Sequence, residues 1–380
     1  MPVFSSSSQQ RISTERTGFY IHIPFCRSRC GYCDFVSFTG NEDCISTYVY
    51  HLCDEIRLHS KQLWGGRTAE TVFFGGGTPS LLELSHIGLI LQALQECFPL
   101  KPDAEITLEA NPESVTADKA AGWRRAGVNR LSLGLQTFDD GLLREIGRLH
   151  TSEQFRQAYQ TARQSGFQNI SFDLIYGIVG QSMKNWRKSL QSAVALAPEH
   201  LSLYSLTIEE HTSFFDKGLR IDEDRQAQMY EWSRSYLRQE GYEQYEISNF
   251  ARPGRVCEHN MIYWRQQDYL GLGVGAVGCV GGVRWQNQKT LNGYETDVTA
   301  QRLPWLSQEI LDAKTRKFER LMLGLRLREG CNWEREDNPG WFSHRRRLAE
   351  KGWLEEIRPG CWRIPDAYIR ITNQVLLPFA

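Results

Sequence analysis

The sequence predicts an α/β protein built on a parallel sheet or partial (β/α)6 barrel, followed by an α+β region and a small C-terminal domain. Short runs rich in β-branched and aromatic residues alternate six times with stretches whose apolar residues recur every three or four positions. Strands that alternate with helices in this way are typical of βαβ units. The 380-residue length allows two or three structural units, at about 150 residues each.

Each expected element follows from its local pattern. Strands are expected at residues 18–23, 71–74, 105–109, 128–133, 170–175 and 201–206, and helices between them at 45–62, 84–97, 117–126, 152–165 and 183–196. In parallel α/β folds ligands bind at the carboxyl ends of the strands, so we expect the functional site there.

The second half changes in composition. A polar helical stretch at 209–240 includes an acidic helix start at 222–224, and residues 241–256 are rich in Tyr, Glu and Asn. One long helix is expected at 309–327, a basic amphipathic helix at 342–356, and strands at 362–365 and 368–377. This helix-then-hairpin order resembles a winged-helix-like domain. We expect a disordered leader (1–16), a barrel (17–208), an α+β extension (209–300) and a winged-helix-like C-terminal domain (301–380).

Composition excludes several classes of protein. A net charge of -1 argues against a surface that coats nucleic acid. The longest uncharged stretch, 270–283, is rich in glycine and shorter than the ~18 apolar residues of a membrane-spanning helix. A basic start followed by an apolar run would indicate export. The sequence does not show this pattern, so we expect a cytoplasmic protein. In a reducing compartment, clustered cysteines indicate a metal site more often than disulfides.

Three of the ten cysteines are clustered. Cys26, Cys30 and Cys33 form a C-x3-C-x2-C pattern, whereas the other seven lie singly. A structural zinc site would need a fourth ligand, and neither His22 nor Cys44 has the usual zinc spacing. A cluster of four irons held by three cysteines leaves one iron open to a small ligand. Three ordinary loop cysteines remain the alternative.

Two arginines flank the cysteines, and polar residues follow several of the expected strands. Arg27 and Arg29 are expected to lower the pKa of the thiols. The strand-end positions are Gly75, Gly76, Gly77 and Thr78 after the second strand, Glu109 and Asn111 after the third, Gln136 after the fourth and Asp173 near the end of the fifth. A single such residue is more often a helix cap or loop residue, but the recurrence at successive strands favours a shared site.

The segment Y-I-H-I-P-F-C at 20–26, continued through Cys33, resembles the radical S-adenosylmethionine (SAM) superfamily and its branch with the oxygen-independent coproporphyrinogen III oxidases. The resemblance implies a 4Fe-4S cluster on Cys26, Cys30 and Cys33, whose open iron SAM chelates. It implies that Gly76, Gly77 and Thr78 bind the amino end of SAM and that Arg148 pairs with its carboxylate. The other implied SAM contacts are Tyr20, Tyr32, Glu109, Gln136 and Asp173.

A glycine-rich segment at 273–278 matches the G-x-G-x-x-G pattern of dinucleotide-binding folds. The helix that this motif requires does not follow, because Gly281 and Gly282 interrupt it. We therefore expect a strand that packs closely against a ligand or another backbone, and no nicotinamide cofactor.

The segment His259-Asn260-x-x-Tyr263-Trp264 allows two interpretations. A histidine beside large aromatics can bind haem iron, but a structural histidine packed among aromatics is more common. H-N-x-x-Y-W resembles the haem-binding signature of the HemW-type haem chaperones, which implies that His259, Asn260, Tyr263 and Trp264 bind haem. Two departures weigh against an oxidase: Phe35 stands where the oxidases carry a fourth cysteine, and only nineteen residues precede Tyr20.

The resemblance therefore implies a haem chaperone that binds a 4Fe-4S cluster, SAM and haem and passes haem to apo-haemoproteins, including respiratory proteins at the inner face of the membrane. It leaves a homodimer open. It implies neither nucleic-acid binding nor an integral membrane protein. The alternatives are an oxygen-independent coproporphyrinogen III oxidase, which would form protoporphyrinogen, and a redox-sensing or structural iron-sulfur protein, which would not bind SAM.

Overall fold

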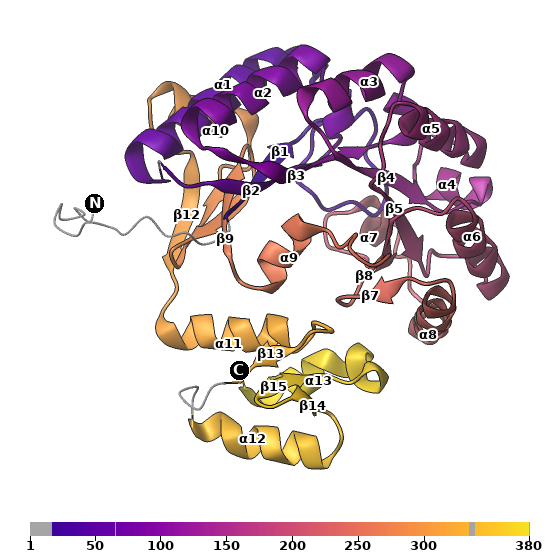
Figure 1. Cartoon of the computed structure of the whole chain (residues 1–380). Coiled ribbons are helices and arrows are strands. Elements are labelled where there is room, and N and C mark those ends of the chain that lie inside the picture. The colour runs from indigo at the N-terminus through magenta and orange to yellow at the C-terminus, as the bar shows by residue number, and fades with distance from the viewer. Residues whose placement is uncertain (1–16, 65, 334–338, 380) are drawn as a thin grey trace.

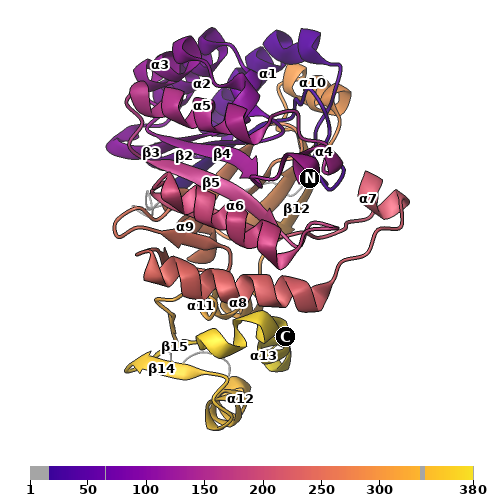
Figure 2. The same cartoon turned by 90° about the vertical axis from the view of Figure 1, so that its right-hand side faces the viewer.

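The computed structural model describes residues 17–64, 66–333 and 339–379 (Figure 1). The expected leader at 1–16 lies outside the described residues. Two bodies are visible: a large one built around a curved sheet, and a small one below it that contains the C-terminal elements (Figures 1 and 2).

Six parallel strands form the centre of the large body. They are β1 (Thr17–Ile23), β2 (Ala69–Gly76), β3 (Leu100–Ala110), β4 (Arg130–Gln136), β5 (Ile170–Tyr176) and β6 (His200–Ser205), and each pairs with the next along the chain. The predicted α/β class and all six predicted strands are confirmed. Since each connection carries the chain back to the amino end of the sheet, all six carboxyl ends point to one side.

Helices cover the outer face of this sheet (Figure 2). The predicted helices are present as α1 (Ile45–His59), α2 (Leu84–Cys97), α3 (Ala117–Ala126), α5 (Ser152–Gln164) and α6 (Met183–Ala195). Side-chain caps fix the starts of α3, α5 and α6: Thr116 caps α3, and Thr151 and Ser182 each form a capping box with the residue three positions later. The short α4 (Asp140–Glu145) was not predicted, because six residues are too few to show a helical period.

The sheet continues at both edges into the second half of the chain. Next to β6 lie the antiparallel β8 (Asn249–Ala251) and β7 (Glu243–Gln244); next to β1 lies the parallel β9 (Asp268–Leu272), followed by β10 (Val277–Val280), β11 (Val283–Asn287) and β12 (Trp305–Ile310). Residues expected to form a separate extension thus belong to the same twelve-stranded sheet. The polar stretch at 209–240 forms α7 (Ser213–Asp216) and α8 (Glu223–Gln239), and Asp222 caps α8; α10 (Leu291–Thr299) packs near α1 (Figure 1).

The glycine-rich segment at 273–278 connects two strands and is not followed directly by a helix. It forms the turn between β9 and β10, which pair in antiparallel fashion. A side chain at Gly271 would place its Cβ 1.9 Å from the carbonyl oxygen of Val277, and one at Gly278 would meet the ring of Trp285 at 2.1 Å. The expected close approach of this strand to another backbone is therefore confirmed.

Two sequence predictions about the C-terminal part are wrong. The single helix expected at 309–327 is interrupted: β12 ends at Ile310, and α11 (Ala313–Gly324) begins after Asp312, whose carboxylate accepts a hydrogen bond from the Thr315 amide at 2.7 Å. The strand expected at 368–377 is helical, with a 3-10 turn at Asp366–Ile371 and then α13 (Thr372–Leu376). Its buried side chains, Ile369, Thr372, Val375 and Leu376, have a helical spacing.

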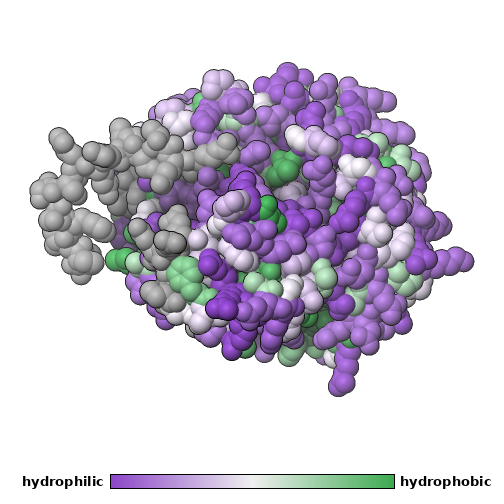
Figure 3. All heavy atoms as spheres, turned by 60° about the horizontal axis from the view of Figure 1, so that its bottom comes forward, coloured by the Kyte–Doolittle hydropathy of each residue, from purple (hydrophilic) through white to green (hydrophobic). Residues whose placement is uncertain are grey.

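The end domain comprises α11, β13 (Cys331–Asn332), α12 (Pro339–Glu350), β14 (Glu355–Arg358), β15 (Cys361–Arg363) and α13, with the three strands in one antiparallel sheet. It has its own apolar core, which includes Leu321, Trp333, Trp341 and Val375 and is separate from the core of the large body. Viewed from the side of the end domain, the surface is mostly hydrophilic, with small scattered apolar patches (Figure 3).

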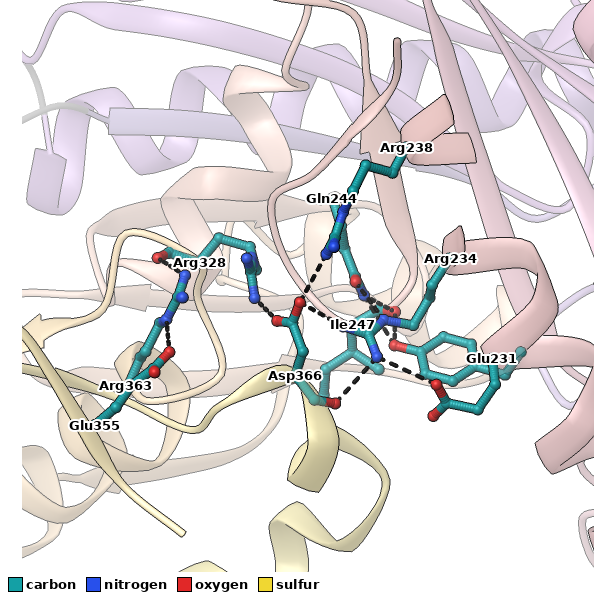
Figure 4. A network of polar contacts seen from close by, with 10 residues as sticks. Glu231, Arg234, Arg238, Gln244, Ile247, Arg328, Glu355, Arg363 and Asp366 are labelled. Carbon is teal, nitrogen blue, oxygen red and sulfur yellow. Dashed lines mark hydrogen bonds and ion pairs between the residues drawn. The ribbon is translucent and has the colours of Figure 1, made fainter. Parts of the chain in front are cut away.

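An ionic network joins the end domain to α8 (Figure 4). Asp366 pairs with Arg234 at 3.1 Å, with Arg238 at 2.8 Å, and with Arg328. Burial and the neighbouring guanidinium groups lower the pKa of Arg328 to about 10. One carboxylate thus holds three cations at this boundary. None of the described helices combines the length and the apolar character that crossing a membrane requires.

Candidate functional site

The loop that carries the three clustered cysteines follows β1 directly. Its two ends are held together, because the Phe38 amide donates to the carbonyl of Pro24 at 2.6 Å and the Cys26 amide donates to the carbonyl of Phe38 at 2.9 Å. The middle of the loop is fixed at Gly31, whose amide donates to the carbonyl of Ile146 at 3.1 Å. The cysteines are therefore presented on an anchored loop at the carboxyl end of β1.

Glycines at the end of β2 allow this loop to approach closely. A Cβ at Gly77 would lie 2.8 Å from the carbonyl oxygen of Phe25 and 3.0 Å from the sulfur of Cys26. Gly76 has a φ of 110°, and a Cβ there would meet the His22 ring at 2.6 Å. A larger residue at Gly77 would push the loop away from the strand end, and one at Gly76 would clash with His22 in a strained backbone conformation, so both glycines are required by the geometry.

A cavity of about 360 Å³ opens at the carboxyl ends of the strands. All three clustered cysteines line it. So do eight of the nine residues expected to contact SAM: Tyr32, Gly76, Gly77, Thr78, Glu109, Gln136, Arg148 and Asp173. We call this the outer cavity. The ninth residue, Tyr20, lines a second cavity deeper in the barrel.

The chemistry of the donor set fits an iron-sulfur cluster. The three cysteines are free thiols, the Thr78 hydroxyl lies 3.6 Å from the sulfur of Cys26, and an Arg148 nitrogen lies 3.8 Å from the sulfur of Cys30. Hydrogen-bond donors directed at thiolate sulfur stabilise such clusters. Within the described ranges, no three His, Cys, Asp or Glu side chains gather at the spacing of a single metal ion.

The expected lowering effect of a flanking arginine on a thiol pKa is present for Arg29 on Cys33, but burial acts in the opposite direction and is larger. Burial raises the pKa of the Cys26 thiol and raises that of Cys33 to about 11, and this effect outweighs the opposing charge of Arg29 on Cys33. Arg27 and Arg29 are both exposed, so water screens their charges. The Cys26 and Cys33 thiols of the free protein are therefore protonated near neutral pH, and binding a cluster must release these protons.

Arg148 is oriented by residues from two strand ends. Its guanidinium donates to the Asn111 side-chain oxygen at 2.5 Å and to the carbonyl of Gly134 at 3.0 Å. This orientation points the group into the outer cavity beside Cys30. Asn111 follows β3 in the sequence and was noticed only as a strand-end residue; its pairing with Arg148 is a contact between distant segments that no local pattern reveals.

Two carboxyl groups lie on the floor of the outer cavity. Glu109 accepts a hydrogen bond from the Gly76 amide at 3.2 Å, and the Ser132 hydroxyl donates to the Asp173 carboxylate, whose two oxygens lie 2.9 and 3.0 Å from it. Burial, with a smaller contribution from Asp173, raises the pKa of Glu109 to about 8. Burial also raises the pKa of Asp173, although its Ser132 bond opposes the shift. Near neutral pH Glu109 thus retains its proton and can donate a hydrogen bond.

The H-N-x-x-Y-W segment forms α9 (Glu258–Trp264), close to the amino ends of the strands. His259 is 1% exposed. Its Nδ1 lies 2.7 Å from the Thr71 hydroxyl and its Nε2 lies 2.8 Å from the Tyr263 hydroxyl. Burial lowers the pKa of His259 to about 3, so the ring is neutral. Because both ring nitrogens are engaged, an iron bond from His259 requires one of these hydrogen bonds to open.

A second cavity, of about 120 Å³, lies between α9 and the outer cavity. We call it the inner cavity. His259, Asn260 and Tyr263 line it, whereas Trp264 packs against the apolar cluster that contains Met261 and Leu327. The inner and outer cavities share Glu109, Ser132, Asp173 and Tyr204 in their walls. The expected haem motif and the expected SAM site are therefore neighbours inside one barrel.

Comparison with known proteins agrees with this geometry. The family model of the radical SAM superfamily matches residues 20–193. A protein of Synechocystis sp. named heme chaperone HemW is 39% identical over 335 residues, which cover 83% of this chain and 79% of that relative. The protein of the same name from Escherichia coli is 41% identical over 263 residues, or 69% of each chain.

A solved structure shows the same fold. The Escherichia coli coproporphyrinogen III oxidase HemN, a radical SAM enzyme, superposes with a TM-score of 0.85 over 97% of this chain and 91% of its own. Only 23% of the residues are identical, so this likeness establishes the fold alone. The superfamily uses a 4Fe-4S cluster and SAM. The extent and identity of the sequence matches show that the chain belongs to the radical SAM superfamily and, within it, to the HemW family.

Proposed function

We propose that the protein is a haem chaperone, which binds a 4Fe-4S cluster, SAM and haem and transfers haem to apo-haemoproteins. The observation that carries this proposal is the pairing of the two cavities: the cysteine-lined outer cavity adjoins an inner cavity lined by three residues of H-N-x-x-Y-W. The proteins named heme chaperone HemW at 36–41% identity support it.

The cofactor assignments follow the geometry of the outer cavity. Cys26, Cys30 and Cys33 would hold the cluster, which supplies an electron to SAM when it is reduced. Arg148 would pair with the SAM carboxylate, since its guanidinium is already oriented by Asn111. The remaining assigned contacts are Tyr20, Tyr32, Gly76, Gly77, Thr78, Glu109, Gln136 and Asp173. Of these, Tyr20 lines the inner cavity, so it would contact SAM only from the side of the inner cavity.

His259 is the proposed iron ligand, with Asn260, Tyr263 and Trp264 completing the haem site. The hydrogen bond from His259 to Tyr263 lies within one short helix, so a local change in α9 can release the Nε2 atom. The present arrangement is then the closed form of the site. Its opening exposes a neutral imidazole, which is the form that binds iron.

We further propose where the protein acts and how the chain is divided. The protein would act in the cytoplasm, where it would meet apo-haemoproteins in solution and respiratory proteins at the inner face of the membrane. It would reach the latter through protein–protein contacts and not through electrostatic attraction of a charged surface to the membrane. A homodimer is compatible with this role. The separate cores favour a division between a barrel unit, with its extension, and an end domain that begins near α11.

The second candidate is an oxygen-independent coproporphyrinogen III oxidase. The fold match to such an enzyme favours it. Phe35 stands against it, because this residue replaces the fourth cysteine of the oxidases and its side chain lies 61% exposed in the wall of the outer cavity.

One pair of assays separates the candidates. Under anaerobic conditions, protein with a reconstituted cluster receives SAM, reductant and coproporphyrinogen III; in parallel, haem-loaded protein is mixed with an apo-cytochrome. We expect haem transfer to the apo-cytochrome and no protoporphyrinogen. Formation of protoporphyrinogen without haem transfer would establish the oxidase instead. Equilibrium dialysis with labelled SAM tests the third possibility, since a purely structural iron-sulfur protein would bind none.

A further inference from the structure

Arg130 is a buried cation without a partner. It begins β4, is 2% exposed, and lines the inner cavity. Its Nε atom is completely buried and has no hydrogen-bond partner. Among the residues that the structure describes, no acidic side chain lies within ion-pair distance of its guanidinium. Buried charges are normally paired, so this group marks a place where a partner is missing.

The carboxylates around Arg130 are already engaged elsewhere. Glu105 accepts hydrogen bonds from the backbone amides of Glu258 and His259, at 3.2 and 3.0 Å, at the start of α9. Asp173 accepts hydrogen bonds from the hydroxyls of Ser132 and Ser202. Both carboxylates raise the pKa of Arg130 through space without contacting it. The guanidinium is thus kept charged while its donors stay free.

Glu109, the third acidic group in the cavity wall, does not neutralise Arg130 either. Its pKa of about 8 leaves it protonated near neutral pH, because it is buried and lies near Asp173. The Arg130 guanidinium therefore lacks a hydrogen-bond acceptor, and a group with two oxygens in one plane would fit it. A planar guanidinium binds a carboxylate in this way through two parallel hydrogen bonds.

The position of Arg130 indicates which carboxylate fits. The inner cavity is also lined by His259, Asn260 and Tyr263 of the haem motif. Its volume of about 120 Å³ has room for a short carboxylate-bearing chain but not for a macrocycle. Such a chain can enter from the outer cavity, because the two cavities share a wall at Ser132 and Asp173.

We propose that Arg130 binds a propionate carboxylate of haem in the inner cavity. The inference rests on the proposed haem-binding function, but it does not require His259 to hold the iron. In this account Arg130 is a specificity residue: it selects a tetrapyrrole with free carboxylates over one whose carboxylates are masked. Tyr263 and Asn260 enclose the same arm and exclude water around the pair.

The test compares haem with its dimethyl ester, which keeps the macrocycle and the iron but has no carboxylates. Affinities of the cluster-loaded full-length protein are measured for both ligands, in the wild type and in Arg130→Gln and Arg130→Lys. We expect the wild type to prefer haem by about 10- to 100-fold, the range of a hydrogen bond between charged groups. Arg130→Gln should reduce this ratio to about one, and Arg130→Lys should retain part of it.

Arg163→Gln is the matched control, because Arg163 is a partly buried arginine on α5 whose guanidinium already pairs with Glu199 at 2.8 Å. Its ratio should equal that of the wild type. A wild-type ratio near one overturns the inference even if Arg130→Gln fails to fold, and so does an unchanged ratio in a folded Arg130→Gln protein. Absence of any haem binding by the wild type is a different result, because it refutes the proposed function itself.

Discussion

The outer and inner cavities occupy the same barrel and share part of a wall, but they are built in opposite ways. The outer cavity is open at the strand ends, and its cysteine thiols and Arg148 face free space. Residues of α9 line the inner cavity, and one of them, His259, has both ring nitrogens bonded to protein. Under the proposed function, the outer cavity can receive its ligands as it stands, whereas His259 must give up one hydrogen bond before it can bind iron.

The largest expected effect is on the outer cavity. Cys30→Ser should abolish the broad iron-sulfur absorbance of anaerobically reconstituted protein, because two thiolates cannot hold a four-iron cluster. SAM affinity should fall at least about 100-fold with the loss of the open iron. Cys97→Ser is the control, since Cys97 lies singly at the end of α2 and does not line the cavity. An unchanged spectrum in Cys30→Ser would remove the cluster from this site.

A smaller loss is expected when the cluster stays but SAM loses its charged partner. Arg148→Gln should weaken SAM binding by about 10- to 100-fold, which corresponds to about 1.5–3 kcal/mol for a charge-assisted hydrogen bond. Isothermal titration on cluster-loaded protein measures it. Arg144→Gln, an exposed arginine one turn away on α4, should bind SAM as the wild type does. Equal affinities in all three proteins would mean that Arg148 only supports the fold.

The burial of His259 predicts that the stability of the protein depends on pH. The folded pKa of His259 is about 3, well below its ordinary value of 6.5. Between these two pH values the imidazole is therefore protonated in the unfolded chain and neutral in the folded chain. Stability is therefore lost as pH falls from 6.5 toward 3, by about 2 kcal/mol at pH 5 at 1.36 kcal/mol per pH unit.

Denaturant unfolding at pH 7 and pH 5 checks this sign. Other buried histidines, such as His200, shift in the same direction, so the difference between variants is the quantity to measure. His259→Gln should lose less stability between the two pH values than the wild type does. His211→Gln, at an exposed position, should behave as the wild type does. A wild-type pH response in His259→Gln would show that the imidazole is not held neutral as described.

The smallest expected effect concerns the boundary between the barrel and the end domain. Asp366→Asn removes the carboxylate that holds three arginines and should weaken docking by about 1–2 kcal/mol. Hydrogen exchange should then accelerate in the 3-10 turn at Asp366–Ile371 and in α13, while β1–β6 stay protected. Glu350→Gln, which breaks an exposed pair with Arg346, is the control. Equal acceleration throughout the chain would argue for one cooperative unit.

The sequence predicted the outer cavity well because its determinants are local. A C-x3-C-x2-C loop and polar residues at strand ends are visible in short windows, and parallel strands bring those ends together. Tyr20 differs from them in depth: it lies three residues before the end of β1, about 10 Å lower at 3.3 Å per residue, and so lines the inner cavity. Depth along a strand decides which cavity a side chain lines.

The inner cavity was less predictable because it depends on contacts between distant segments. The H-N-x-x-Y-W pattern identified the residues, but only the fold shows that Thr71 and Tyr263 occupy the two nitrogens of His259. The sequence alone does not identify Arg130 as a candidate site residue, because an arginine at the start of a strand is common. Its burial and its lack of a partner are visible only in the structure. At the C-terminus, Ile369, Thr372 and Leu376 have a helical spacing that was already present in the sequence, although the segment was predicted as a strand.

The central claim is that haem binds beside the cluster and SAM in one barrel. The most direct test is a haem titration of the full-length protein, with and without the reconstituted cluster and SAM, followed by absorbance spectroscopy. The account predicts one haem per chain with the spectrum of a histidine-ligated iron, and loss of that signature in His259→Ala. A haem stoichiometry near zero in the cluster-loaded protein, or an identical haem spectrum in His259→Ala, would contradict it.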